Sequence, residues 1–200
     1  MQGTLVAAVV DLTQRQHGAA TSHQLRRLGV SAKAQRTAER DGWLVRVEPC
    51  VVVLGASSDT WVRRLRIGLL ALDARGWVSH EAAAALYGWP GGPAEPVEFT
   101  VPRDARGLRC AATVHTTEDV RPGDVRTVRG LRCSAPIRTL IDLARYGVPG
   151  ARLQAATEAA VRAGLVDPSG AGRRLGAQAA GATKSRSCST APTSSGRRSA

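Results

Sequence analysis

The sequence lacks the cysteine and histidine spacing of a metal-binding knuckle. Its four cysteines, Cys50, Cys110, Cys133 and Cys188, are far apart in the chain, and no closely spaced pair of histidines accompanies them. Because zinc knuckles need ligands at short and regular spacing, we expect no metal site and no cofactor. No secretory signal is present, so reduced thiols in a cytoplasmic protein are expected.

Lysine is scarce, and its positions exclude one class of enzyme. Lys33 and Lys184 are the only lysines, and Ser31 and Ala182 stand two residues before them. A metal-dependent nuclease of the restriction-endonuclease fold needs an acidic residue at that position, so that the metal ligand and the lysine meet at one phosphate. A Gly-rich phosphate loop and a serine-nucleophile elbow are also absent. We therefore expect that the protein is not an enzyme.

Long apolar runs are missing as well, and the charge that is present is mostly positive. The early run Leu5–Val10 is far too short to span a bilayer, so no membrane partner is expected. The chain has 28 Lys+Arg against 16 Asp+Glu, a net charge of +12. That excess suits a polyanionic partner such as DNA, although an arginine-rich composition is equally typical of a GC-rich genome. Half of the excess lies in residues 168–200, which have six basic and no acidic groups.

The stretch from Thr21 to Leu54 has the pattern around which the rest of the chain is interpreted. A short helical pattern runs to Leu28, Gly29 supplies a turn, and a second helical pattern follows the expected N-cap Ser31. Two β-rich segments, 43–47 and 51–54, come next. Helix, tight turn, helix and hairpin is the order of a winged helix-turn-helix, whose second helix enters the DNA major groove.

The second helix of this motif has basic side chains at helical spacing. Lys33, Arg36 and Arg40 fall at i, i+3 and i+7, so they form one stripe, and Gln35 lies beside it. Arginine and lysine bind guanine O6 and N7, and glutamine binds adenine. Ser31, Lys33, Gln35 and Arg36 are therefore the expected base contacts. The alternative is an ordinary solvated helix face.

Three further arginines are expected to position the protein on the phosphate backbone. Arg26 and Arg27 should point outward from the first helix of the motif, and Arg46 should lie on the wing. For Arg46, a solvent-facing strand residue is an equally good interpretation. These three and the residues of the second helix complete the predicted DNA-binding set.

The remaining periodicities predict an α+β arrangement. The Arg138 and Asp142 side chains, four residues apart on one helix, are expected to pair in a structural role, and His80 is expected to be structural. After Leu175 the sequence has no large aliphatic or aromatic residue, which predicts a disordered basic tail. Helices are expected over 1–16, 61–75, 79–87, 134–146 and 151–164, and strands over 97–101, 112–115, 125–128 and 131–133.

Three runs of residues carry a resemblance to a known family. The chain resembles the AbiEi-type antitoxins of type IV toxin–antitoxin systems, especially their actinobacterial members, in three runs. These are GVSAKAQRTAERDGWLVRVEPCVVVLG, the segment Ser79–Gly88 (SHEAAAALYG) and the segment Pro136–Ala144 (PIRTLIDLA). The chain departs from them at Glu48-Pro49-Cys50, where the wing usually has an Arg-Gly-Val-Tyr-like sequence. The resemblance implies a DNA-binding regulator that represses its own operon, and a cognate toxin resembling a nucleotidyltransferase as a further partner.

Relatives with this architecture often continue into a nuclease-like domain, which we expect to be missing here, so the tail is either native or a frameshift product. The expected fold class is α+β: a winged helix-turn-helix over 1–55, a small mixed α/β antitoxin-like domain over 60–165, and a disordered basic tail over 176–200. The expected function is operator binding to double-stranded DNA. The alternatives are a protein-interaction module that neutralises a toxin or dimerises, and a truncated inactive relative.

Overall fold

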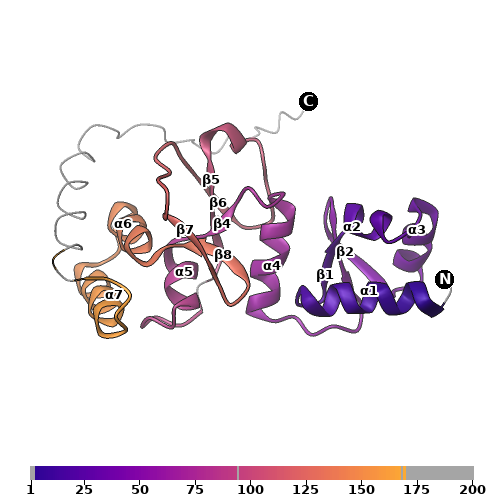
Figure 1. Ribbon diagram of the computed structural model, residues 1–200, viewed down its shortest axis with the longest axis horizontal. Helices are drawn as coiled ribbons and strands as arrows, with labels where there is room; N and C mark the ends of the chain where they lie inside the picture. The colour runs from indigo at the N-terminus through magenta and orange to yellow at the C-terminus, as the bar shows by residue number, and fades with distance from the viewer. Residues whose placement is uncertain (1–2, 94, 168, 170–200) are drawn as a thin grey trace, which may run out of the picture.

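The N-terminal part of the computed structural model is a three-stranded antiparallel sheet with three helices against it (Figure 1). The structure describes residues 3–93, 95–167 and 169. The strand order is β1-β3-β2. In chain order the elements are α1 (Gly3–Arg15), β1 (Ala19–Thr21), α2 (Ser22–Arg27), α3 (Ala32–Arg40), β2 (Leu44–Glu48) and β3 (Val51–Leu54).

This first sheet is buried on both faces, which explains the run of three valines in its central strand. Val52 packs with Val9 of α1 and Leu25 of α2 on one face. Val51 and Val53 point to the other face, because successive side chains of a strand alternate. That face is covered by Ile67, Leu70 and Ala71 of the helix α4 (Trp61–Ala71).

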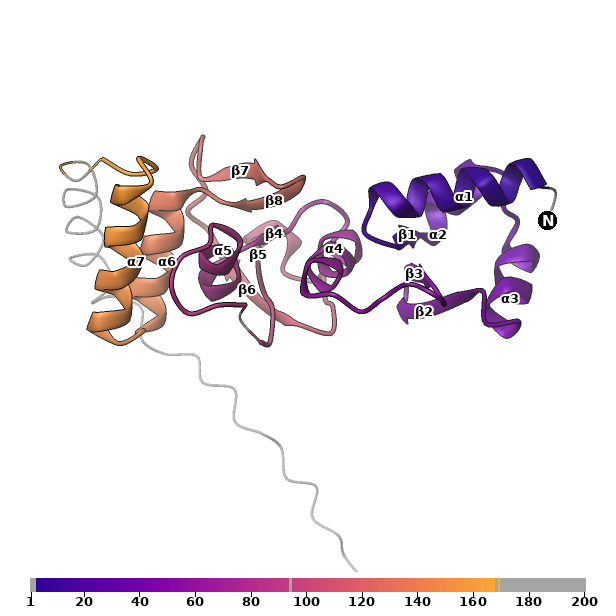
Figure 2. The same ribbon diagram turned by 90° about the horizontal axis from the view of Figure 1, so that it is seen from below.

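Helix α4 lies between the two sheets of the molecule (Figures 1 and 2). Its other side presents Leu65 and Leu69 to the core of the second sheet. At Gly68 the helix passes so close to that core that an added Cβ would lie 2.2 Å from Cζ of Phe99. The segment before α4 is fixed by the buried guanidinium of Arg63, whose Nη1 donates to the Ser57 carbonyl oxygen at 2.5 Å.

The second sheet is mixed and has the strand order β6-β5-β4-β8-β7. The pairs β4–β5 and β7–β8 are antiparallel, whereas β4–β8 and β5–β6 are parallel. Helix α5 packs against β5 and β8, α6 packs on α5, and α7 packs on α6. The elements are β4 (Trp77–Val78), α5 (His80–Leu86), β5 (Glu98–Pro102), a 3-10 turn (Arg103–Ala105), β6 (Thr113–Thr117), β7 (Val125–Val128), β8 (Leu131–Ser134), α6 (Pro136–Tyr146) and α7 (Gly150–Arg162).

The α+β class expected from the sequence is confirmed, with two differences in detail. Strands β1 and β4 were not expected. The helix expected to run to Leu28 ends at Arg27, and Leu28 is 38% exposed where the chain turns. The predicted tail over 176–200 lies outside the described residues. Among the helices that are described, none is long and apolar enough to cross a membrane.

Candidate nucleic-acid interface and a buried histidine cluster

Helices α2 and α3 each begin at a side-chain cap. Thr21 Oγ1 accepts from the Gln24 backbone N–H at 3.1 Å, and the Gln24 side chain accepts from the Thr21 N–H at 2.8 Å. This capping box starts α2. Ser31 Oγ accepts from the Ala34 N–H at 3.2 Å and starts α3, as the sequence predicted. The Ser31 hydroxyl, which was expected to contact a base, therefore accepts a hydrogen bond within the fold as the N-cap of α3.

Gln35 lies inside the fold, contrary to its expected place beside the basic stripe. Its side chain is 3% exposed, and Nε2 donates to the Val30 carbonyl oxygen at 3.1 Å and to the Ser22 carbonyl oxygen at 3.3 Å. These bonds tie α3 to the turn and to the start of α2. Because the amide is buried and bonded to the backbone, it has no open path to a base edge. The expected base contact of Gln35 is therefore wrong, because the residue lies on the buried side of α3.

The basic stripe itself faces solvent. Lys33, Arg36 and Arg40 are all exposed on α3. Arg40 Nε lies 3.1 Å from Oδ1 of Asp41, whereas Lys33 and Arg36 form no ion pair with any described residue. Two cations of the stripe are therefore free to meet an external anion.

Arg46 is bonded to neighbouring elements of the fold, whereas the sequence suggested either a phosphate contact or a solvent-facing strand residue. Its guanidinium forms a two-bonded ion pair with Glu39 of α3, with Nε 3.1 Å from Oε2. Nη1 donates to Ser22 Oγ at 3.2 Å and to the Pro49 carbonyl oxygen at 2.9 Å. The residue thus joins the strand β2 to both helices and to the hairpin turn, and much of its charge is balanced by Glu39.

Arg26 and Arg27 are exposed at the end of α2, as predicted, and form no ion pair within the described part of the chain. Arg27 lines a cleft of about 330 Å³ between α2, α4 and the β7–β8 hairpin. Arg66 and Arg132 line the same cleft. Burial lowers the pKa of Arg66, whose Nη2 donates to the Gly130 carbonyl oxygen at 2.7 Å. The positive surface of α2 therefore continues onto the second sheet.

A second polar site lies in the second sheet, where two histidines and a glutamate meet. His80 begins α5, Glu98 begins β5 and His115 is in β6. The imidazole rings of His80 and His115 stack with centroids 3.8 Å apart, and Nε2 of His115 lies 3.0 Å from Oε1 of Glu98. Tyr146 of α6 presents its ring at 5.4 Å from both imidazoles. Burial, and then the neighbouring His115, lower the pKa of His80 to about 4, so its ring is neutral near pH 7.

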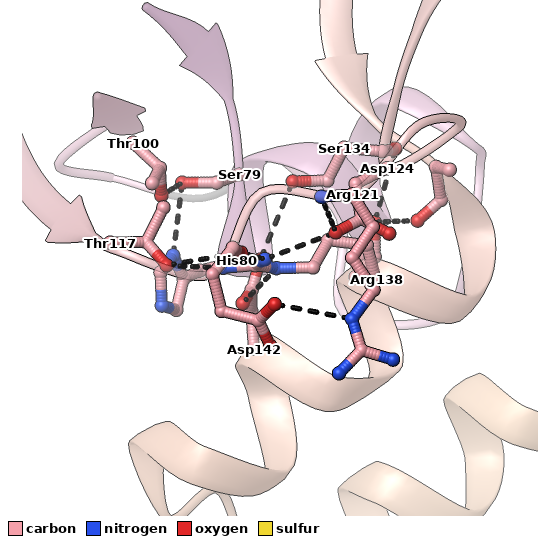
Figure 3. Close-up of polar contacts among 12 residues, drawn as sticks. Ser79, His80, Thr100, Thr117, Arg121, Asp124, Ser134, Arg138 and Asp142 are labelled. Atoms are coloured by element: carbon pink, nitrogen blue, oxygen red, sulfur yellow. Dashed lines mark hydrogen bonds and ion pairs between the residues drawn. The ribbon is translucent and has the colours of Figure 1, made fainter. Parts of the chain in front are cut away.

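Ser79 is the N-cap residue of α5, but its hydroxyl makes no capping bond. Instead, Ser79 Oγ accepts from Thr100 Oγ1 at 2.8 Å and lies 2.9 Å from Nδ1 of His80 (Figure 3). The free N–H at the helix start is satisfied by Glu98, whose Oε2 accepts from the Glu81 N–H at 3.1 Å. Ser79, Thr100 and Glu98 therefore orient the histidine cluster as well as the start of α5.

The backbone of His80 is strained. Its φ is 51°, in the left-handed region that residues with a side chain adopt at a cost of roughly 1–3 kcal/mol. Such a cost persists only where the surroundings hold the residue in place, and here Ser79 and the stacked ring of His115 do so. Strained residues of this kind are typical of functional sites, so the cluster is a candidate site.

Next to the cluster, α6 carries the predicted pair of Arg138 and Asp142. Arg138 Nε lies 2.8 Å from Asp142 Oδ1, and both side chains are at least 95% buried (Figure 3). Arg138 also donates to the Asp119 carbonyl oxygen at 2.6 Å and lies 3.4 Å from Oδ2 of Asp124. Burial raises the pKa of Asp142 more than Arg138 lowers it. The predicted pairing is confirmed, and the burial of both side chains could not be predicted from their spacing of four residues.

The three described cysteines are free thiols. Burial raises the pKa of Cys133 to about 12 and that of Cys110 to about 11, so neither is a reactive thiolate near pH 7. Cys188 lies outside the described residues. The histidine cluster was missed by the sequence analysis because its members are up to 35 positions apart, and only the pairing of β5 with β6 brings Glu98 and His115 together.

Comparison with solved structures finds the Rv2827c protein of Mycobacterium tuberculosis among the similar chains. The match has a TM-score of 0.50 at 16% sequence identity and covers 86% of this chain and 81% of that chain. At this identity the likeness shows a shared fold over most of both chains and nothing more. No family model and no curated protein matches the sequence.

Proposed function

We propose that the protein is a DNA-binding transcriptional regulator that uses a winged helix-turn-helix. The order α1, β1, α2, α3 and the β2–β3 hairpin supports this motif, in which α3 would be the helix that enters the major groove. The observation that carries the proposal is the exposed face of α3, where Lys33 and Arg36 form no ion pair with any described residue. Such side chains bind guanine edges in the major groove.

The other basic residues fit supporting roles in the same proposal. Arg26 and Arg27 at the end of α2 would contact backbone phosphates, which fix the orientation of a protein on DNA. Arg46 and Gln35 would hold the hairpin and α3 in place for that contact, because both are bonded to neighbouring elements. Ser31 would cap α3 and present its helix start to the groove.

The resemblance to the AbiEi-type antitoxins supports a more specific function, the repression of the protein's own operon in the cytoplasm. A toxin resembling a nucleotidyltransferase would then be a second partner. The alternative is a protein-interaction module, in which the α2–α3 unit is only a scaffold and the chain binds a toxin or a second copy without reading DNA.

The test is a fluorescence-anisotropy titration of the full-length chain on the DNA upstream of its own gene, against scrambled DNA. The C-terminal segment has six cations and no acidic side chain, so it is expected to attract any DNA through the phosphates. A second protein therefore replaces these cations by glutamine: Arg173, Arg174, Lys184, Arg186, Arg197 and Arg198. A regulator keeps its preference for the upstream DNA in this variant near physiological salt. Equal binding to both DNAs, lost as salt rises, favours the interaction module.

A further inference from the structure

We propose that His80, Glu98 and His115 form a binding site for a divalent transition-metal ion of the zinc type. The potential donor atoms of these three residues all lie within 4.8 Å of one another. Two imidazoles and one carboxylate suit zinc and its transition-metal neighbours, whereas magnesium and calcium prefer oxygen ligands. The inference is independent of DNA binding, because the cluster lies in the second sheet.

The spacing of the donor atoms is close to that of a coordinated ion. Nε2 of His115 and Oε1 of Glu98 are 3.0 Å apart. In a tetrahedral site with bonds of about 2.0–2.1 Å, neighbouring donor atoms are about 3.3–3.4 Å apart. An ion would replace the proton between Nε2 of His115 and Oε1 of Glu98, and the two atoms would move slightly apart to accommodate it. The rings of His80 and His115 are tilted by 30°, and binding would open this tilt so that both nitrogens turn to the ion.

The residues around the donors are bonded as in a metal site. A histidine ligand is usually oriented by a hydrogen bond at its second ring nitrogen. In His80 that bond joins Nδ1 to Ser79 Oγ, which in turn accepts from Thr100 Oγ1. Glu98 is oriented by the Glu81 N–H, which leaves Oε1 to face His115. The strained φ of His80 is held by the same contacts and turns its ring toward the other two residues.

The site has an entrance. The side chain of His115 is 22% exposed, whereas Glu98 is 8% exposed, and the ring of Tyr146 stands beside both imidazoles with 59% of its surface exposed. With three protein ligands, a tetrahedral ion keeps one position for water or for another donor. Binding would also link α5, β5 and β6 through one ion and so stabilise the second sheet.

The test is a Zn²⁺ titration of the metal-free, full-length protein by calorimetry, with Mg²⁺ as the comparison ion. We expect one Zn²⁺ per chain that Mg²⁺ does not displace. Glu98→Gln replaces the carboxylate by a neutral, weaker amide ligand and His115→Ala removes an imidazole, so each should weaken this binding by more than about 100-fold. Bound ion at about 100 times its Kd should raise the Tm by roughly 5–10 °C in the wild-type protein and not in these variants.

Two further variants separate the site from effects on folding. His80→Asn removes the imidazole but keeps a residue that tolerates positive φ, and His17→Asn makes the same change at a φ of 54° outside the cluster. We expect loss of Zn²⁺ binding only in the first. Thr100→Val keeps all three donors and should weaken binding by roughly 10–100-fold. The proposal is overturned if the wild-type protein does not bind Zn²⁺, or if Glu98→Gln and His115→Ala bind it as the wild-type protein does.

Discussion

Gln35 and Arg36 are neighbours on α3 and have opposite surroundings. The Gln35 amide is buried and bonded to two backbone carbonyl oxygens, while the Arg36 guanidinium is exposed and free of any ion pair with the described residues. Their roles in stability and in binding should therefore be separable by substitution.

Gln35→Ala should lower the free energy of unfolding by about 1–3 kcal/mol, because it removes the buried side-chain donor to the Val30 carbonyl oxygen and the bond that ties α3 to the start of α2. Arg36→Ala should change that free energy by no more than about 0.5 kcal/mol, as is usual at a surface position. Urea denaturation followed by circular dichroism measures both. Equal effects of the two substitutions on unfolding would contradict the placement of Gln35.

The buried pair on α6 gives a second prediction at this scale. Asp142→Ala leaves the Arg138 guanidinium buried without its nearest carboxylate, which typically costs about 3–5 kcal/mol. The loss in the free energy of unfolding should be near the lower end of this range, because Oδ2 of Asp124 remains 3.4 Å from Nη1 of Arg138. The control is Asp11→Ala, which breaks an exposed pair with Arg15 and should cost about 0–1 kcal/mol in the same denaturation experiment. Similar losses in the two proteins would count against a structural role for the buried pair.

At the scale of the elements, α4 decides how the two sheets are joined. It buries one side against the valines of β3 and the other against the core around Phe99. The close approach to Phe99 depends on the missing side chain of Gly68. We therefore expect that a larger residue is unfavourable at Gly68 and tolerated at a helix glycine that has no such neighbour.

Gly68→Ala should destabilise the protein by about 1–3 kcal/mol, because the added methyl group overlaps the ring of Phe99 and forces the helix or the ring to move. Gly3→Ala places the same methyl group in open space on α1 and should be neutral or stabilise by up to about 1 kcal/mol. Thermal unfolding of the two variants gives the comparison. A neutral Gly68→Ala would mean that α4 does not pack on the second sheet as described.

The longer elements were predictable from the sequence, and the shortest were not. Apolar spacing placed the helices α1, α3, α4 and α6 and the β2–β3 hairpin near their observed bounds. Strands β1 and β4 have three and two residues, too few for a periodic pattern, and their pairing partners are distant in the sequence. The burial of Gln35 and the histidine cluster were missed for the same reason, since both depend on contacts between elements and not on local spacing.

At the scale of the whole molecule, α4 connects a sheet whose helices carry the unpaired cations with a sheet that contains the histidine cluster (Figure 2). The first sheet and its helices supply the proposed contact with DNA. The second sheet and its helices supply the proposed metal site. The basic cleft lined by Arg27, Arg66 and Arg132 lies where the two parts adjoin.

The most direct test of the central proposal is whether α3 reads bases. The variant with the neutralised C-terminal segment is titrated on the upstream DNA and on versions with single base-pair changes, with and without Arg36→Ala. The account predicts that Arg36→Ala loses about 1–3 kcal/mol of binding and no longer distinguishes one of the changed base pairs, while its fold is unchanged. Binding that ignores every base change, with the same affinity after Arg36→Ala, would contradict it.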